Sequence, residues 1–167
     1  MELMNLSCEA FLEDLAGSAP APGGGGAAAL VGAAGAALGN MVGNLTIGKK
    51  KYAAVEADIL ILNRRAAALR KRLEGLVQAD ADAFAPLAAA YKLPKETPEQ
   101  QAYKAAVLEA ALEGACAVPL EIMSACCEGI ALAAEYAEKG SVMAVSDAGC
   151  AALFCKAALQ AAGLNVS

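Results

Sequence analysis

Alanine content is the feature that most narrows what this chain can fold into, because 44 of its 167 residues are alanine. Only 16 residues are β-branched: nine valines, five isoleucines and two threonines. Alanine has the highest helix propensity, whereas strands favour β-branched and aromatic side chains. Aromatic residues make up only 4% of the chain. The sequence therefore predicts an all-α fold, and a chain of this length is expected to form one domain.

Start and stop signals divide the chain into about five helices, two of them long. Thr97 and Gln100 form a capping box around Pro98, which predicts a helix start. This helix is expected to bend at Pro119. The predicted helices cover residues 7–16, 26–47, 52–90, 97–139 and 146–163. Together they predict a helical bundle.

The stretch from Gly26 to Ile47 has 22 residues without a charge and is followed by three lysines, so a transmembrane helix has to be considered. Only seven of the 22 are Leu, Ile, Val or Met, and Asn40 and Asn44 would have to enter the bilayer at a high cost. Small residues recur at every fourth position, which allows close helix–helix approach: Gly35, Gly39 and Gly43. We interpret the stretch as a helix buried in a soluble bundle.

Composition limits the partners and the compartment. Charged residues make up 19% of the chain and the mean hydropathy is +0.46, so we expect much of the surface to pack against another subunit. A net charge of −5 argues against nucleic acid as a partner. The six cysteines show no CxxC spacing and no secretory leader precedes them, which predicts reduced thiols and a cytoplasmic location. Since there is no histidine, the commonest metal ligand is missing and we expect no metal site.

A glycine tract is the first candidate for a binding site. Pro22 is followed by Gly23, Gly24, Gly25 and Gly26, which lead directly into a predicted helix. The free amide hydrogens and the dipole at a helix start can bind an anion. The tract matches no nucleotide-binding motif, because no strand precedes it and no Gly-Lys-Ser/Thr follows. The alternative is a flexible turn into a tightly packed helix.

A basic cluster lies at the far end of the same helix. Lys49, Lys50 and Lys51 precede Tyr52. In an otherwise acidic chain, this cluster could form a local seat for a polyanionic ligand. The alternative is that the lysines stabilise the negative end of the helix or lie at a solvated corner.

Asp80 and Asp82 stand in an otherwise apolar run of the third predicted helix. Two positions apart, they point in different directions, so at most one can face the interior. A carboxylate among alanines is expected to be partly buried, which would raise its pKa and suit it to proton transfer. Without histidine, carboxylates and lysines are the main candidates for acid–base chemistry. The alternative for each aspartate is a solvated helix face.

These motifs together resemble the formiminotetrahydrofolate cyclodeaminase and methenyltetrahydrofolate cyclohydrolase family. The segments that carry the resemblance follow in the family's order: 19–38, 41–52, 80–84, 90–95, 118–120, 146–149 and 164–166. Two departures stand out. Gly26 replaces the serine that the family signature usually carries, and family members continue past Val166 with another helical segment. The chain is thus expected to be a single domain, 1–167, that lacks this C-terminal segment.

The resemblance implies an all-helical, dimeric enzyme that acts on one-carbon tetrahydrofolates. In cyclodeamination, N10 attacks the 5-formimino carbon and ammonia leaves, giving 5,10-methenyltetrahydrofolate. In cyclohydrolysis, water attacks the methenyl carbon and the ring opens to 10-formyltetrahydrofolate. Both reactions need a proton acceptor and a proton donor but no metal or redox cofactor. The sequence leaves both activities open, along with a non-catalytic folate-binding module.

Residue chemistry and motif position together suggest roles within that family. We predict that Asp82 transfers the protons, with Asp147 as the second candidate. The four glycines Gly23 to Gly26 would shape the ligand cleft, and Asn44 would bond to the pterin edge. The glutamate tail or the pterin would be held by Lys49, Lys50 and Tyr52.

Overall fold

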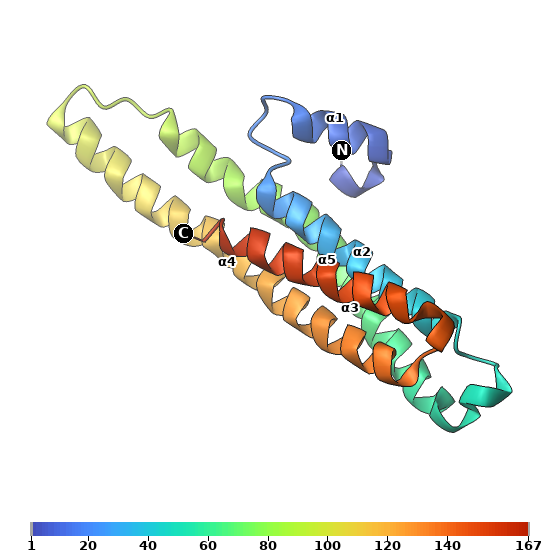
Figure 1. Cartoon of the computed structure of the whole chain (residues 1–167). Helices are drawn as coiled ribbons and strands as arrows, with labels where there is room; N and C mark the ends of the chain where they lie inside the picture. Colours follow the sequence, from blue (N-terminus) through green and yellow to red (C-terminus); the bar gives the residue numbers. More distant parts are fainter. Residues whose placement is uncertain (1, 167) are drawn as a thin grey trace.

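The structure, a computed structural model, describes residues 2–166 as an elongated helical bundle (Figure 1). Its helices are α1 (Cys8–Ala16), α2 (Gly24–Asn44), α3 (Glu56–Tyr91), α4 (Pro98–Lys139) and α5 (Val145–Gly163). Short 3-10 helices cover Leu3–Asn5, Lys50–Val55 and Val142–Ala144, and the described residues contain no strand. The predicted all-α fold of five helices, two of them long, is confirmed. α2 begins two residues earlier than predicted, inside the glycine tract.

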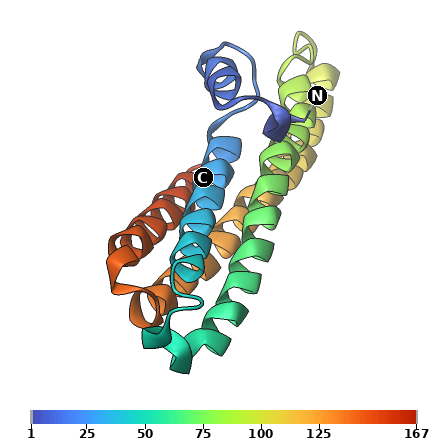
Figure 2. The ribbon, with the colours of Figure 1, turned by 90° about the vertical axis from the view of Figure 1, so that its right-hand side faces the viewer.

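α2 packs against α3, α4 and α5 (Figures 1 and 2). The glycines of α2 are the points of closest approach. A Cβ atom at Gly35 would lie 2.7 Å from the Sγ atom of Cys155 in α5, and one at Gly39 would lie 3.0 Å from the ring of Tyr136 in α4. At Gly43 it would collide with the Asn63 side chain of α3. The regularly spaced glycines of α2 therefore contact three different helices.

Thr46 fixes the turn that follows α2. Its buried hydroxyl donates to the Val42 carbonyl at 2.7 Å and accepts from the backbone N–H of Ser141 at 2.8 Å. Gly48 adopts a positive φ of 77°, and its N–H donates to the carboxylate of Glu56 at 3.0 Å. These contacts tie the end of α2 to the connection between α4 and α5.

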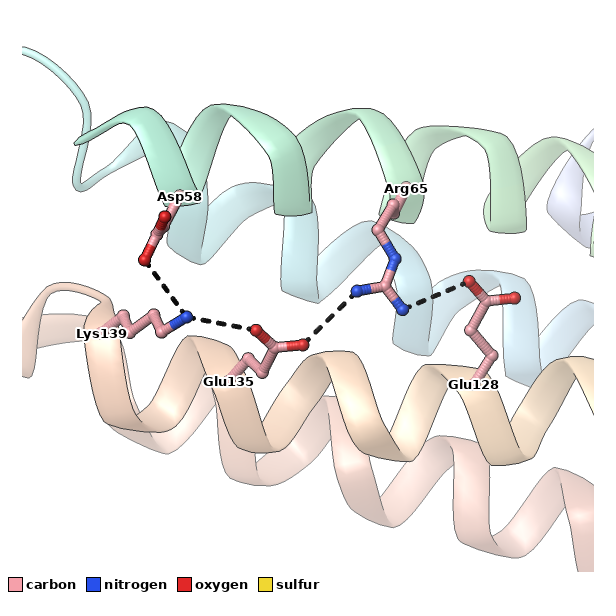
Figure 3. A network of polar contacts seen from close by, with 5 residues as sticks. All are labelled: Asp58, Arg65, Glu128, Glu135 and Lys139. Carbon is pink, nitrogen blue, oxygen red and sulfur yellow. Dashed lines mark hydrogen bonds and ion pairs between the residues drawn. The ribbon is translucent and has the colours of Figure 1, made fainter. Parts of the chain in front are cut away.

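A chain of ion pairs links α3 to α4 along the outside of the bundle (Figure 3). Lys139 lies 3.3 Å from both Asp58 and Glu135, and Arg65 lies 3.4 Å from Glu135 and 3.7 Å from Glu128. The side chains are partly exposed, so each pair contributes little to stability. Their repetition along both helices favours one register of α3 against α4.

The far halves of α3 and α4 extend past α2 and α5 as a two-helix arm (Figures 1 and 2). The predicted capping box begins α4: the Thr97 hydroxyl accepts from the Gln100 N–H, and the Gln100 side chain accepts from the Thr97 N–H, both at 3.2 Å. Pro86 lies inside α3 and Pro119 inside α4, and both helices continue through them. The base of this arm meets the start of α2, where the glycine tract lies.

Three helical stretches are long and apolar enough to cross a membrane, judged by length and composition: α2, α4 and residues 142–163. In the bundle, 56% of the apolar window of α2 is buried against other helices. Its neighbour α3 is not apolar in this way, because charged residues such as Arg64, Arg65 and Arg72 lie along it.

We predict that Gly35→Ala lowers the free energy of unfolding by roughly 1–3 kcal/mol, because the new methyl group overlaps Cys155 Sγ and the Ala151 carbonyl oxygen. The matched control is Gly75→Ala, a mid-helix glycine of α3 with nothing within 4 Å of an added Cβ. This control should raise stability by up to about 1 kcal/mol. Urea unfolding of both variants tests the prediction, and equal effects would contradict it.

Candidate functional site

A cleft of about 300 Å³ opens at the start of α2, where the base of the arm meets the glycine tract. Gly23, Gly24 and Gly25 form one side. Two strongly polar side chains line it, Asp80 from α3 and Asn165 from the residues after α5, together with the free thiol of Cys116 from α4. Apolar side chains of α3 and α4 make up much of the remaining wall: Phe84, Leu87, Leu112 and Pro119. The cleft therefore combines apolar walls with a few polar groups, as small-molecule sites do.

Asp80 lies directly over the first turn of α2. A Cβ atom at Gly25 would collide with its carboxylate, so glycine at this position is what allows the close approach. The N-cap residue Gly23 has no side chain to cap the helix, and the backbone N–H of Gly26 is hydrogen-bonded to Asp80 instead. The positive end of the helix dipole thus meets a carboxylate from another helix.

Burial raises the pKa of the Asp80 carboxyl above its ordinary value, and the hydrogen bond from Gly26 offsets only part of that rise. No lysine or arginine lines the cleft to hold the carboxylate ionised. A half-buried carboxyl with a raised pKa exchanges a proton more readily near neutral pH than an ordinary aspartate does. Asp80 is the carboxyl group among the side chains of the cleft, and its raised pKa makes it our candidate for acid–base chemistry.

Asn165 lies at the edge of the cleft, against Gly24. Its amide nitrogen donates to the Ala161 carbonyl at 2.9 Å, which anchors it to the last turn of α5. Sequence reasoning assigned no role to this residue. Its place in the last segment of the family resemblance was the available signal.

The structure places Asp82 outside this cleft. Asp82 is exposed, accepts a hydrogen bond from Gln78 at 2.9 Å and lines a separate hollow with Lys71 and Glu74. The expectation that at most one of the two aspartates faces the interior is met, and the one that does so is Asp80. Asp82 does not lie beside the glycine tract, so its position gives no support to the proton-transfer role predicted for it.

The other predicted site residues lie at the opposite end of α2. This helix has 21 residues, so its ends are roughly 30 Å apart. Lys49 and Lys50 are exposed, and Asp147 lies half-buried in the first turn of α5. The Tyr52 phenol accepts the Val142 N–H at 3.0 Å, which lowers the pKa of Tyr52. Within one chain, the structure does not bring these residues to the glycine tract.

Asn44 belongs to an amide cluster in an open groove of about 780 Å³ between α2 and α3. Its side-chain oxygen accepts from the Asn63 amide at 2.9 Å. The buried Tyr136 hydroxyl donates to the Asn63 oxygen at 2.7 Å, and Asn40 donates to the Asn63 backbone carbonyl at 2.9 Å. The cluster uses much of its hydrogen-bonding capacity internally and ties α2 to α3 and α4.

Among residues 2–166, no group of three His, Cys, Asp or Glu side chains is placed to hold a metal ion. The two fully buried thiols, Cys126 and Cys155, lie in the helical core. Burial raises the pKa of Cys126 to about 12 and that of Cys155 to about 11, so both remain protonated near neutral pH.

Comparison with known proteins gives consistent matches. The family model described as Formiminotransferase-cyclodeaminase matches residues 7–167. A methenyltetrahydrofolate cyclohydrolase of Methylorubrum extorquens is 51% identical over 162 residues, which are 97% of this chain and 78% of the relative. The formimidoyltransferase-cyclodeaminase of Rattus norvegicus is 35% identical over 98% of this chain and 30% of its own length. A crystal structure of formiminotetrahydrofolate cyclodeaminase from Thermotoga maritima superimposes with a TM-score of 0.86 at 31% identity, covering 99% of this chain and 78% of that one.

We predict that Asp80→Asn stabilises the protein at neutral pH. Since the folded state raises the Asp80 pKa, ionisation costs more in the folded chain than in the unfolded one. That cost is absent below the ordinary pKa of 3.8 and grows as the pH rises through the raised value. The stability advantage of Asp80→Asn should therefore be present at pH 7 and shrink as the pH falls.

Urea unfolding at several pH values measures this effect, with Asp82→Asn as the matched control. Because the Asp82 side chain is exposed, its neutralisation should leave stability close to that of the parent protein. A parent protein more stable than Asp80→Asn at pH 7 would show that the carboxylate stabilises the start of α2.

Proposed function

Because the chain belongs to the formiminotransferase-cyclodeaminase family, we propose that it is a cytoplasmic enzyme of folate one-carbon metabolism. Its proposed active site is the cleft at the start of α2, and its substrate is a tetrahydrofolate that carries a one-carbon unit. The observation that carries this proposal is the half-buried Asp80 carboxyl over the glycine tract. The proposal involves neither nucleic acid nor a membrane.

In cyclodeamination, Asp80 takes the proton that N10 loses as it attacks the carbon of the protonated formimino group, whose nitrogen becomes an amino group. The same carboxyl then returns the proton to the amino nitrogen, which leaves as ammonia when the 5,10-methenyl bridge forms. A single acid–base group can serve both steps if its pKa lies nearer neutrality than that of an ordinary aspartate, as burial of Asp80 arranges. These proton transfers call for no metal or redox cofactor.

Cyclohydrolysis is the second candidate, and the 51% identity to a cyclohydrolase favours it. Here Asp80 takes a proton from the water that attacks the methenyl carbon. The C–N5 bond then breaks as N5 receives that proton, and the second proton of the water is released to solvent as the formyl C=O of 10-formyltetrahydrofolate forms. The same carboxyl performs both reactions, and the substrate differs.

The cleft volume of about 300 Å³ suits the reacting ring system better than a whole folate. The glutamate tail would extend beyond it. The far end of α2 is too distant for its residues to contact a folate bound in the cleft of the same chain. This holds for Asn44, the last residue of α2, and for Lys49, Lys50 and Tyr52, which follow it. We propose that they contact the substrate only if a second copy brings that end of the bundle to the cleft.

We further propose a homodimer that buries the apolar outer faces of α2 and α5, which lie side by side (Figure 1). Val31 and Met41 of α2 are exposed, as are Leu153 and Phe154 of α5, with Leu153 63% exposed. Burial of these exposed apolar side chains against a second subunit would remove them from water.

The activity test compares Asp80→Asn with Asp82→Asn. We expect Asp80→Asn to lower turnover about 10²- to 10⁴-fold, the range for loss of a general acid–base group. Asp82→Asn should keep near-parental turnover. Full activity in Asp80→Asn, or loss of activity in a folded Asp82→Asn, would contradict the role of Asp80 and assign proton transfer to Asp82.

The absorbance of the 5,10-methenyl group identifies the reaction in the same assay. Its appearance from 5-formiminotetrahydrofolate indicates cyclodeaminase, and its disappearance on adding enzyme indicates cyclohydrolase. Folate binding without either change would indicate a non-catalytic binding module and overturn the enzymatic proposal.

Analytical ultracentrifugation of detergent-free protein tests the dimer. We expect the parent to sediment as a dimer and Leu153→Glu to shift it to monomer, because a carboxylate at the interface would be desolvated. Leu12→Glu, at an equally exposed leucine of α1, is the matched control and should remain dimeric. A monomeric parent protein would contradict the proposed homodimer.

A further inference from the structure

The free hydrogen-bonding atom of Asn165 can be identified from its anchoring bond. The side-chain amide faces the Ala161 carbonyl at 2.9 Å. A carbonyl oxygen cannot donate, so the atom facing it must be the amide nitrogen, Nδ2. The other terminal atom, Oδ1, accepts no hydrogen bond from residues 2–166, which leaves an acceptor available at the cleft edge.

The amide is held in place on two sides. The backbone N–H of Asn165 donates to the Ala162 carbonyl at 3.0 Å, which continues the last turn of α5. On the other side, a Cβ atom at Gly24 would lie 3.5 Å from both Nδ2 and Oδ1, which is ordinary van der Waals contact. Asn165 is therefore a polar group positioned by the end of α5 against the first turn of α2.

The polar side chains of the cleft are thus mainly acceptors. Asp80 offers carboxylate oxygens and Asn165 offers Oδ1, while no lysine, arginine, serine or threonine lines the cleft. A ligand group that pairs with these two side chains has to bring its own N–H groups. The reduced pterin ring does so along its aminopyrimidinone edge, where the 2-amino group and N3–H are adjacent donors.

We propose that Asn165 is a specificity-determining residue whose Oδ1 accepts a hydrogen bond from the aminopyrimidinone edge of the pterin. This inference rests on the proposed function, since it assigns one end of the same substrate. Asp80 acts at the one-carbon centre, whereas Asn165 holds the ring. Because that hydrogen bond is present in both the bound substrate and the transition state, its loss should raise KM and leave kcat nearly unchanged.

The first test measures kcat and KM for Asn165→Ala. We expect KM to rise about tenfold to a hundredfold, as for a ligand donor left without its acceptor, and kcat to stay within about threefold. The matched control is Leu164→Ala, an adjacent residue that is 79% exposed and does not line the cleft. This control should keep the parental KM.

The second test changes the substrate instead of the protein. The parent and Asn165→Ala are each assayed with folates whose pterin lacks the 2-amino group or carries a methyl group on N3. If Asn165 reads this edge, the parent should lose affinity for at least one analogue, and Asn165→Ala should show no further loss for that analogue. Non-additive effects of this kind identify a direct contact.

The outcomes separate this inference from the proposed function. The role of Asn165 would be overturned by an unchanged KM in Asn165→Ala, or by a parent protein that binds both analogues as tightly as the unmodified folate. If the parent still turns over folate and Asp80→Asn does not, the proposed function stands without it. A parent that turns over neither folate overturns both. The analogue assay on the parent protein gives a result even if Asn165→Ala fails to fold.

Discussion

The close approach of three helices to the glycines of α2 is the constraint on which the rest of the structure depends. Each glycine inside a helix costs about 1 kcal/mol relative to alanine. That cost is offset because side chains of α3, α4 and α5 pack directly against the α2 backbone. Gly35 faces Cys155, Gly39 faces Tyr136 and Gly43 faces Asn63. A methyl group at any of these positions requires the neighbouring side chain or its helix to move.

The same constraint builds the candidate site. Gly25 lets α3 come close enough for Asp80 to lie over the first turn of α2, where it takes the place of a side-chain cap. The contact desolvates the carboxyl and raises its pKa. The group that satisfies the start of α2 is thus also the group best suited to proton transfer. Stability given up at such a position is common where a site needs a perturbed acid.

Part of the site could be predicted from the sequence, and the reason for the missing part is geometric. The glycine tract was identified because its composition is distinctive, and the aspartate pair because carboxylates are rare among alanines. Alanines flank both Asp80 and Asp82, so their immediate neighbours do not distinguish them. The apolar stripe of α3 does, because Asp80 continues the spacing of Leu73 and Leu76 whereas Asp82 does not. Asn165 was also missed, because a polar residue after a helix is ordinary until its neighbours are known.

The sequence by itself determined the all-α class, the number and approximate limits of the helices, and the glycine spacing of α2. These properties follow from local propensity, from caps such as Thr97 and from periodicity, which act within a few residues. Only the tertiary structure decided that Asp80 shares a cleft with Gly25 and Asn165, and that Lys49 and Lys50 lie at the other end of the bundle. Those facts depend on the length of α2, which separates the two ends of the bundle, and on which faces of the helices pack against each other. Contacts between residues distant in sequence set both.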